Sequence, residues 1–316
     1  MSEKEIKERA AGSDEERADQ ARRRFLKGLG GIAATVAAPP AAQAAWGGRT
    51  LGDAFADFFQ KHYQRMSADE VQETLRRIER KAQSRYGVAI TCKGTPAQPG
   101  VVFGYAINIS KCKGYRDCVT ACKHENNLGS DIEYIRVLEM DEGSFNLEKA
   151  DHYYDHEVVP APDKYYLPVQ CMQCDDPPCV KACPIGATWM EPDGVVVVDY
   201  DWCFGCRYCM AACPYQARHF NWGRPQLPAA RINPDTHYLG NRPRPTGVVE
   251  KCHFCLQRTR DGRNPACLEA CPTGARVFGN LLDRSSELRY VLQNKVVFRL
   301  KEDLGTEPKV WYYRDD

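Results

Sequence analysis

The chain has 316 residues, enough for two domains, and its 43 Lys and Arg nearly balance its 42 Asp and Glu, for a formal net charge of +1. Such a neutral chain offers no electrostatic basis for binding nucleic acid, so we expect no nucleic-acid partner. Cysteine is the unusual residue, because 15 of the 16 cysteines fall in four groups between residues 112 and 271. This clustering favours metal binding over scattered structural thiols.

Residues 1–44 have the features of an export signal. The sequence RRRFLK at residues 22–27 fits the twin-arginine pattern R-R-x-F-L-K, and the small-residue sequence AQA follows at residues 42–44. The mildly apolar run between them, residues 28–38, is too short for an amino-terminal membrane anchor, which needs about 20 residues. We therefore expect a periplasmic protein, exported by the twin-arginine route.

Residues 45–95 are predicted to form a helical segment and a linker. Ser67 and Glu70 fit the S-x-x-E capping box, and apolar residues then recur on one face of a strongly charged helix. A connector rich in Gly and Pro, residues 91–100, follows and carries Cys92, the cysteine outside the four groups. This segment is expected to pack on the remainder or to dock a partner.

From residue 96 to residue 280, short predicted strands alternate with cysteine groups. The strands lie near residues 104–109, 165–169, 195–199 and 247–250, and each leads directly into one group. The fold class predicted from this rhythm is α+β, with two bacterial-ferredoxin-like domains and the helical segment as an amino-terminal extension.

Long insertions interrupt the predicted core. They cover residues 126–163 and the Pro-rich residues 223–246, and loops of this length usually make contact with another molecule or another part of the protein. The turn EPDG at residues 191–194 is expected to join two strands as a hairpin. Residues 281–316 are predicted to form a carboxyl-terminal tail that cannot cross a membrane, so a membrane span would have to come from another subunit.

Three of the four cysteine groups carry a complete motif. The second reads C-x2-C-x4-C-x3-C-P, the third C-x2-C-x2-C-x3-C-P and the fourth C-x2-C-x11-C-x3-C-P. Three thiolates on a tight loop can bind one iron-sulfur cube, while the fourth thiolate, on the following helix, points toward a different cluster. The three groups consist of Cys171, Cys174, Cys179 and Cys183; Cys203, Cys206, Cys209 and Cys213; and Cys252, Cys255, Cys267 and Cys271.

The first group departs from this motif. It contains only Cys112, Cys118 and Cys122, because Tyr115 stands at the position of the second cysteine, and Lys123 replaces the final proline. One thiolate is therefore missing from the set of sixteen that four complete clusters require.

Three other uses of the cysteines compete with iron-sulfur binding. Disulfides suit an exported protein, but cysteines two residues apart on a tight loop cannot all find partners at good geometry. Zinc sites take ligands in pairs, whereas here they come as three plus one. Haem attachment needs C-x2-C-H, which does not occur. The motifs favour iron-sulfur clusters, with disulfides and zinc as the alternatives.

Residues 101–283 closely resemble the four-cluster iron-sulfur electron-transfer subunits of the dimethyl sulfoxide reductase family. The resemblance is carried by QCDDPPC at residues 173–179, KCHFC at residues 251–255 and PACLEACPTGA at residues 265–275. The exported form, with LGNRP at residues 239–243, most resembles the DsrO branch, the periplasmic iron-sulfur subunits of the sulfur-metabolism complex DsrMKJOP.

The resemblance implies how the groups pair. The outer two groups would form one ferredoxin-like domain and the inner two another, within residues 165–222. Carried over, three sites are complete and bind 4Fe-4S clusters, while the fourth lacks a thiolate. They are site A (Cys171, Cys174, Cys179, Cys213), site B (Cys203, Cys206, Cys209, Cys183), site C (Cys252, Cys255, Cys267, Cys122) and site D (Cys112, Cys118, Cys271, with Tyr115 at the missing position).

Site D is expected to be altered or absent. Loss of the second cysteine is how ferredoxin-type sites come to bind a 3Fe-4S cluster, so the site would hold three irons or stay empty. Rescue by Cys92 and ligation by the Tyr115 phenolate are the other outcomes. Cationic side chains near the groups are expected to offset cluster charge: Lys111, Lys113, Arg116, Lys123, Arg207, Arg218, Lys251 and Arg258.

The resemblance implies an electron-transfer subunit of an oxidoreductase complex, with no catalytic residue of its own. It would relay single electrons between an integral membrane quinone-interacting (NrfD-like) subunit and a further redox subunit, such as a cytochrome or a molybdopterin protein, in sulfur-compound respiration or oxidation. A diffusible exported polyferredoxin and an electron-transfer subunit of a molybdopterin oxidoreductase are the alternatives. An oxidoreductase acting alone is disfavoured, because no G-x-G-x-x-G motif occurs.

Overall fold

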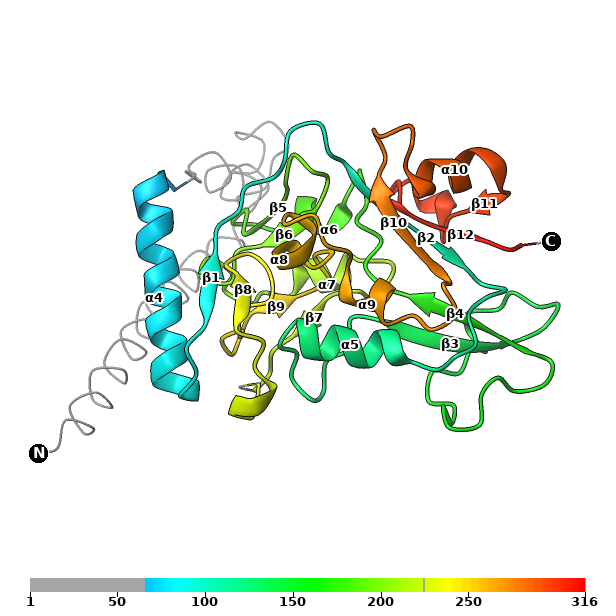
Figure 1. Cartoon of the computed structure of the whole chain (residues 1–316), viewed down its shortest axis with the longest axis horizontal. Coiled ribbons are helices and arrows are strands. Elements are labelled where there is room, and N and C mark those ends of the chain that lie inside the picture. Colours follow the sequence, from blue (N-terminus) through cyan, green and yellow to red (C-terminus); the bar gives the residue numbers. More distant parts are fainter. Residues whose placement is uncertain (1–65, 224, 316) are drawn as a thin grey trace, which may run out of the picture.

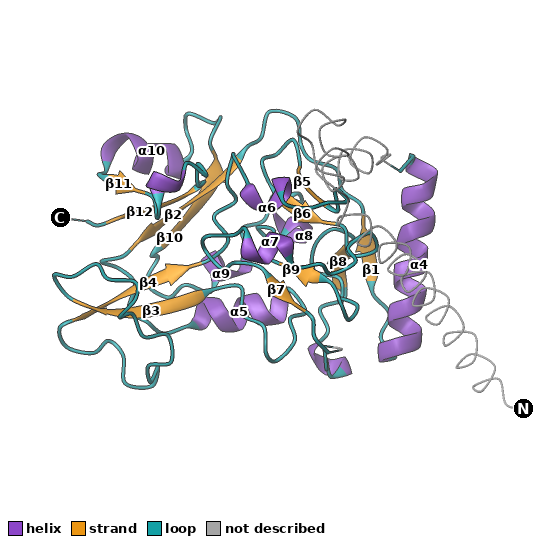
Figure 2. Ribbon diagram, turned by 180° about the vertical axis from the view of Figure 1, so that it is seen from behind, coloured by secondary structure: helices purple, strands orange, loops and turns teal. Residues whose placement is uncertain are grey.

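The computed structural model describes residues 66–223 and 225–315. The predicted export signal, residues 1–44, lies outside the described residues, as do residues 45–65 of the predicted extension. Helix α4 (Ala68–Tyr86) stands at one end of the long axis and helix α10 (Glu287–Asn294) at the other, with the short helices of the cysteine groups between them (Figure 1). Figure 2 shows the same arrangement from behind.

Helix α4 begins at the capping box that the sequence predicts. The Ser67 N–H donates to Glu70 Oε2 at 2.7 Å, and the Glu70 N–H donates to Ser67 Oγ at 3.4 Å. Strand β1 (Thr91–Lys93) follows the helix and pairs in parallel with β8 (Asp235–His237). The helix docks on these strands through an apolar cluster of Leu75, Ile78, Ala82, Ile90, Cys92, Leu227 and Ile232.

The largest sheet has four strands in the order β10-β2-β12-β11. Its central strand β2 (Phe103–Asn108) is buried along its whole length and pairs antiparallel with β10 (Arg276–Asn280) and parallel with β12 (Val310–Tyr313). Strand β11 (Val297–Phe298) completes the edge, and α10 covers one face. The segment predicted as a tail, from residue 281 onward, therefore supplies two strands and a helix to the core.

Three antiparallel two-stranded ribbons surround the cysteine loops: β3 (Arg136–Asp141) with β4 (Lys164–Val169), β5 (Thr188–Met190) with β6 (Val196–Val198), and β7 (His219–Phe220) with β9 (Val249–Glu250). The β5-β6 hairpin closes on the expected turn, where the Gly194 N–H donates to the Glu191 carbonyl at 2.9 Å. The insertion predicted after the first group contributes strand β3, so part of it is regular structure.

Short helices follow the cysteine loops and pack in two pairs. Helix α5 (Asp117–Glu125), of the first group, packs on α9 (Ala266–Glu269), of the fourth. Helix α6 (Pro178–Lys181), of the second group, packs on α7 (Tyr208–Ala211), of the third. Helix α8 (Leu256–Thr259) and the 3-10 turns Ala229–Arg231 and Glu302–Leu304 complete the described elements. Helices and short strands thus mix in one α+β fold, as the sequence predicts.

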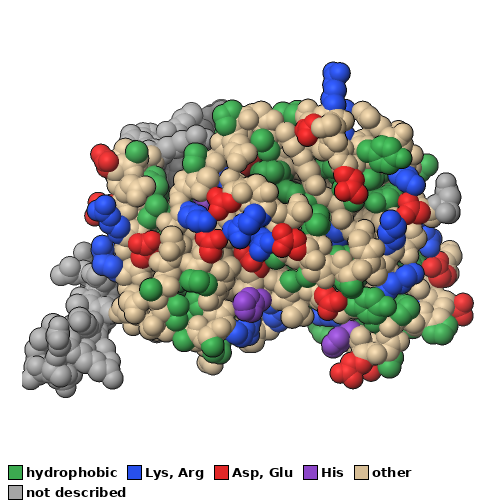
Figure 3. Space-filling view, in the orientation of Figure 1, with side chains coloured by type: hydrophobic (Ala, Val, Ile, Leu, Met, Phe, Trp, Pro, Cys, Tyr) green, Lys and Arg blue, Asp and Glu red, His purple; other side chains and the backbone are tan. Residues whose placement is uncertain are grey.

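The surface matches the balanced composition. In Figure 3, Lys and Arg side chains are interspersed with Asp and Glu across the visible face. Within residues 66–223 and 225–315, no helix combines the length and the apolar character that crossing a bilayer requires.

Candidate iron-sulfur centres

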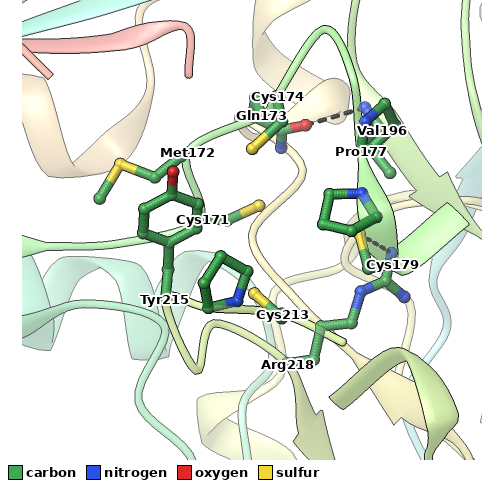
Figure 4. Close-up of a pocket in the computed structure, with 12 residues that line it drawn as sticks. Cys171, Met172, Gln173, Cys174, Pro177, Cys179, Val196, Cys213, Tyr215 and Arg218 are labelled. Carbon is green, nitrogen blue, oxygen red and sulfur yellow. Dashed lines mark hydrogen bonds between the residues drawn. The ribbon is translucent and has the colours of Figure 1, made fainter. Parts of the chain in front are cut away.

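Site A is a cavity lined by the four thiols that the family pairing groups together. Cys171, Cys174, Cys179 and Cys213 surround a space of about 340 Å³, its open mouth included, and Figure 4 shows their sulfur atoms directed into it. The loop is held by Gln173, whose Oε1 accepts the Val196 N–H at 2.8 Å. Strand β4 thus delivers the first thiols, and the chain after α7 delivers the last.

Site B is a second cavity, of about 330 Å³, lined by Cys183, Cys203, Cys206 and Cys209. The loop between them depends on Gly205, which has φ of 80°. A Cβ at this position would lie 2.2 Å from the Gly247 carbonyl oxygen, a distance that backbone cannot relieve cheaply. Glycine therefore lets the loop approach the turn before strand β9 and places its three thiols on one side.

Arg218 lies between these two cavities and lines both. Its NH2 donates to Cys179 Sγ at 3.1 Å (Figure 4) and also to Thr188 Oγ1 at 2.9 Å. Its Nε and NH1 are buried and find no acceptor among the described residues. Burial opposes the charge of the guanidinium, but the thiolates of Cys179 and Cys209 outweigh burial and raise its pKa above the ordinary value.

The residues around sites A and B fit iron-sulfur clusters. Each cavity offers four thiols around an open space, and across the described residues no three Cys, His, Asp or Glu side chains meet closely enough to share one metal ion. A buried cation with unused N–H donors suits a cofactor that carries net negative charge and accepts hydrogen bonds at sulfur.

Site C gathers Cys122, on helix α5, with thiols of the fourth group. Burial raises the pKa of Cys122, and the neighbouring charges of Cys255, Cys252 and Cys267 raise it further. Asn126 links two of these thiols, because its Nδ2 lies 3.4 Å from Cys122 Sγ and 3.6 Å from Cys255 Sγ. The packing of α5 on α9 accounts for this meeting of residues far apart in the sequence.

Site D gathers Cys112, Cys118 and Cys271. Burial raises the pKa of Cys112 to about 11, and the charges of the other two thiols act in the same direction. The Ala275 N–H donates to Cys271 Sγ at 3.4 Å. The Tyr115 side chain is 41% exposed, and this position at the surface argues against phenolate ligation.

Cys92 occupies a different part of the molecule. It lies on strand β1 in the apolar cluster under helix α4, opposite Thr236 of strand β8. Burial raises the pKa of Cys92 to about 11, and the charge of Arg242 acts in the opposite direction. The structure does not bring Cys92 to site D.

Arg276 is a site residue that the sequence interpretation missed. Its NH2 donates to Cys118 Sγ at 3.3 Å, and its NH1 lies 3.0 Å from Gln170 Oε1 and 3.4 Å from the Tyr105 hydroxyl. The same hydroxyl lies 3.4 Å from Cys267 Sγ, so Arg276 and Tyr105 fill the space between sites D and C. The sequence does contain a pattern that points to Arg276, because the motif C-P-x-x-A-R at residues 213–218, which ends at Arg218, recurs at residues 271–276.

Most of the cations expected to offset cluster charge have other partners. Arg116 donates to Glu133, Arg258 pairs with Glu125, and the Lys251 ammonium donates to the Cys252 carbonyl. Only Arg218, among those expected, donates to a cysteine sulfur in the described part of the chain.

Sites A and C are also neighbours. Burial raises the pKa of Cys252 to about 12, and the next cause is the charge of Cys171, which belongs to site A. The loops are joined directly, because Gln173 Nε2 donates to the Cys252 carbonyl at 2.7 Å. The four sites therefore follow one another in the order B, A, C, D.

A known family matches the region of this chain that carries sites A and B. A family model described as a 4Fe-4S dicluster domain matches residues 162–244 and 239–281, which carry the second, third and fourth groups. A candidate iron-sulfur subunit of dimethyl sulfoxide reductase from Halobacterium salinarum is 40% identical over 66% of this chain and 78% of its own length.

Two further relatives carry menaquinone or menaquinol in their names. The iron-sulfur cluster-binding subunit of menaquinone reductase from Nitratidesulfovibrio vulgaris is 38% identical over 67% of this chain and 88% of its own length. Iron-sulfur subunit 1 of the Hdr-like menaquinol oxidoreductase of Archaeoglobus fulgidus is 39% identical over 62% and 71%. The chain belongs to the family of iron-sulfur electron-transfer subunits of dimethyl sulfoxide reductase-type and menaquinol oxidoreductase complexes.

Proposed function

We propose that this protein is the periplasmic relay of a quinone-linked complex, passing single electrons through clusters at sites B, A, C and D. The clusters supply reversible one-electron chemistry when bound, and the protein supplies their order. The observation that carries the proposal is the unbroken row of contacts. Arg218 joins B to A, Gln173 and the Cys252 carbonyl join A to C, and Arg276 with Tyr105 joins C to D.

Both ends of this row have exposed groups beside them. Three of the four thiols of site C are buried, whereas all three of site D are half-buried. At the other end, the loop and strand around site B expose Trp202, Tyr208 and Trp222, the last two by 64% and 68%. We infer that electrons enter and leave at sites B and D, each facing a different partner.

We propose an integral membrane, quinone-interacting NrfD-like subunit as one partner and a cytochrome or molybdopterin protein as the other. The menaquinone reductase and menaquinol oxidoreductase names of two relatives support the first. The twin-arginine sequence supports a periplasmic location, and the LGNRP sequence supports the DsrO branch and a role in sulfur-compound respiration or oxidation.

A second candidate is the electron-transfer subunit of a molybdopterin oxidoreductase. The names of the dimethyl sulfoxide reductase relative and of a selenate reductase subunit from Mesobacillus selenatarsenatis, 39% identical to this chain, favour it. In both candidates the chain carries electrons and the partner performs the substrate chemistry.

We further propose three 4Fe-4S clusters at sites A, B and C, with a 3Fe-4S cluster or no cluster at site D. The surface position of Tyr115 and the separate position of Cys92 support this count, because neither adds a fourth ligand to Cys112, Cys118 and Cys271.

Isolation of the native complex tests the proposal. A tagged full-length chain is solubilised from membranes of its own host, and its companions are identified by mass spectrometry, with an untagged strain as the control. We expect an integral membrane quinone-interacting protein and one further redox protein, with the tagged chain becoming reduced when menaquinol is added. Recovery of the chain alone from the periplasm would support the diffusible polyferredoxin, and a molybdopterin protein as sole companion would support the second candidate.

A further inference from the structure

We propose that Arg218 and Arg276 are equivalent tuning residues, each placed between the two clusters of one ferredoxin-like half and raising the reduction potentials of both. The proposal rests on the proposed function only in requiring clusters at these sites, and it concerns the isolated chain rather than its partners. The sequence predicts only that Arg218 offsets cluster charge, and it assigns no role to Arg276.

The same contact between an arginine and a cysteine sulfur is made twice in this molecule. Arg218 donates to Cys179, the third cysteine of the second group, at 3.1 Å. Arg276 donates to Cys118, which holds the third cysteine position of the first group, at 3.3 Å. Each arginine lies five residues after the last cysteine of the partner group. Two independent stretches of chain thus build one arrangement, which a chance surface charge would not do.

Each guanidinium also lies between both sites of its half. Arg218 lines the cavities of site A and site B together. Arg276 contacts site D through Cys118 and reaches site C through Tyr105, whose hydroxyl lies 3.4 Å from Cys267 Sγ. Both arginines are nearly inaccessible to water, with exposed fractions of 3% and 5%. Their charge therefore acts through protein instead of through screening solvent.

The physical effect follows from the sign of the charge. Reduction adds one negative charge to a cluster, so a buried cation stabilises the reduced form more than the oxidised form and raises the potential. Hydrogen bonds to sulfur act in the same direction. Because Arg218 retains two N–H donors without a protein acceptor, Nε and NH1, we expect its influence on sites A and B to exceed that of Arg276 on sites C and D.

Redox titrations followed by EPR test the proposal on the full-length chain loaded with iron and sulfide. Arg218→Gln is expected to lower the midpoint potentials of two clusters together, and Arg276→Gln to lower those of the other pair by less. Arg218→Lys keeps the charge and is expected to recover part of the shift. Lys181→Gln is the matched control, because Lys181 lies on α6 near site A with its side chain 66% exposed.

Iron content separates the possible failures. An Arg218→Gln protein with wild-type iron content and wild-type potentials overturns the proposal, and so does an equal shift in Lys181→Gln. A lysine variant shifted as far as the glutamine variant contradicts the argument from charge. A wild-type chain that binds no iron contradicts the proposed function instead.

If Arg218→Gln fails to load iron, the wild-type protein decides the question. Arginine labelled with ¹⁵N in the guanidinium is incorporated, and pulsed EPR of the reduced protein is expected to show ¹⁵N coupling to a cluster, lost in labelled protein carrying Arg218→Lys and Arg276→Lys. Absence of the coupling in the wild type overturns the proposal, because a tuning residue must lie against the cluster.

Discussion

Gln173 donates a hydrogen bond from Nε2 to the Cys252 carbonyl at 2.7 Å, and so one amide joins the loop of site A to the loop of site C. Its Oε1 accepts the Val196 N–H, which fixes the amide orientation from the other side. Gln173 is fully buried and has a positive φ of 46°. The contact therefore holds together loops contributed by the inner and outer pairs of groups.

Replacing Gln173 by Ala is expected to destabilise the loaded protein. The change leaves the buried Val196 N–H without an acceptor, at about 1–3 kcal/mol, and it removes one of the two donors to the Cys252 carbonyl, which keeps the Lys251 ammonium. Denaturant unfolding followed by circular dichroism measures the loss. Gln72→Ala, on the exposed face of α4, is the control and should change the free energy of unfolding by less than about 0.5 kcal/mol. Equal stability of the two variants contradicts the role given to Gln173.

Tyr115→Cys is expected to convert site D. A thiol at the second motif position supplies the missing ligand, so the three-iron EPR signal of the oxidised protein disappears and the iron content rises. If site D is empty in the wild type, the iron content rises without loss of a signal. The control is Tyr290→Cys, which adds an exposed thiol on α10 and should change neither quantity. A wild-type count of sixteen irons with no three-iron signal would mean that site D is complete as it stands.

Arg244→Met is expected to be strongly destabilising. Arg244 Nε donates to Glu250 Oε2 at 2.6 Å, both side chains are almost completely buried, and NH1 donates to the Asn126 carbonyl beside site C. Removing one member of a buried ion pair costs about 3–5 kcal/mol, because the other charge stays buried. Unfolding of the loaded protein measures this loss.

Two further variants test whether the buried ion pair is the source of this loss. A double variant that also carries Glu250→Leu should recover part of the loss, since no buried charge is then left without a partner. The exposed pair Arg314 and Glu142 is the control, and Arg314→Gln should cost less than about 1 kcal/mol. A double variant no more stable than Arg244→Met would show that the ion pair is not the source.

Stability is expected to fall as the pH drops from about 6.5 to about 4, in part through His237. Burial lowers the pKa of His237 from 6.5 to about 4, while its Nε2 lies 3.0 Å from the Thr95 carbonyl. The unfolded chain therefore binds a proton in this window that the folded chain does not, which favours unfolding by about 3 kcal/mol at the acid end.

The measurement is the pH dependence of the free energy of unfolding in the wild type and in His237→Gln. The variant loses this titration, so its profile should be flatter between pH 6.5 and pH 5, whatever its absolute stability. His156→Gln, at an exposed position, serves as the control. Parallel profiles for the wild type and His237→Gln would contradict the assignment of this pH dependence to His237.

The sequence predicted the features that depend on local spacing. The cysteine motifs, the capping box at Ser67 and Glu70, and the hairpin turn before Gly194 each involve residues within about twenty positions of one another. Cysteine spacing also predicted which loops would place three thiols together. Such features need no knowledge of the remaining chain.

Features that depend on distant residues were missed. Strand β12 pairs in parallel with β2, which lies about 200 residues earlier in the sequence, and no local sequence pattern predicts this pairing. Arg276 received no role because a single arginine at the start of a strand carries no chemical signal by itself. Its proposed role follows from the hydrogen bond that its NH2 donates to Cys118 Sγ and from the repeat of C-P-x-x-A-R at Arg218. Comparing the groups residue by residue beyond their cysteines would have revealed it.

The parallel pairing of β12 with β2 has a consequence for the order of events during synthesis. The second and third groups emerge from the ribosome together and can close sites A and B while the carboxyl end is still being made. Strand β2 must wait for the last described residues of the chain before its second edge is covered. The outer half is therefore completed only after residues 310–313 have been made, and a protein that ends before residue 310 would expose β2 to cellular quality control.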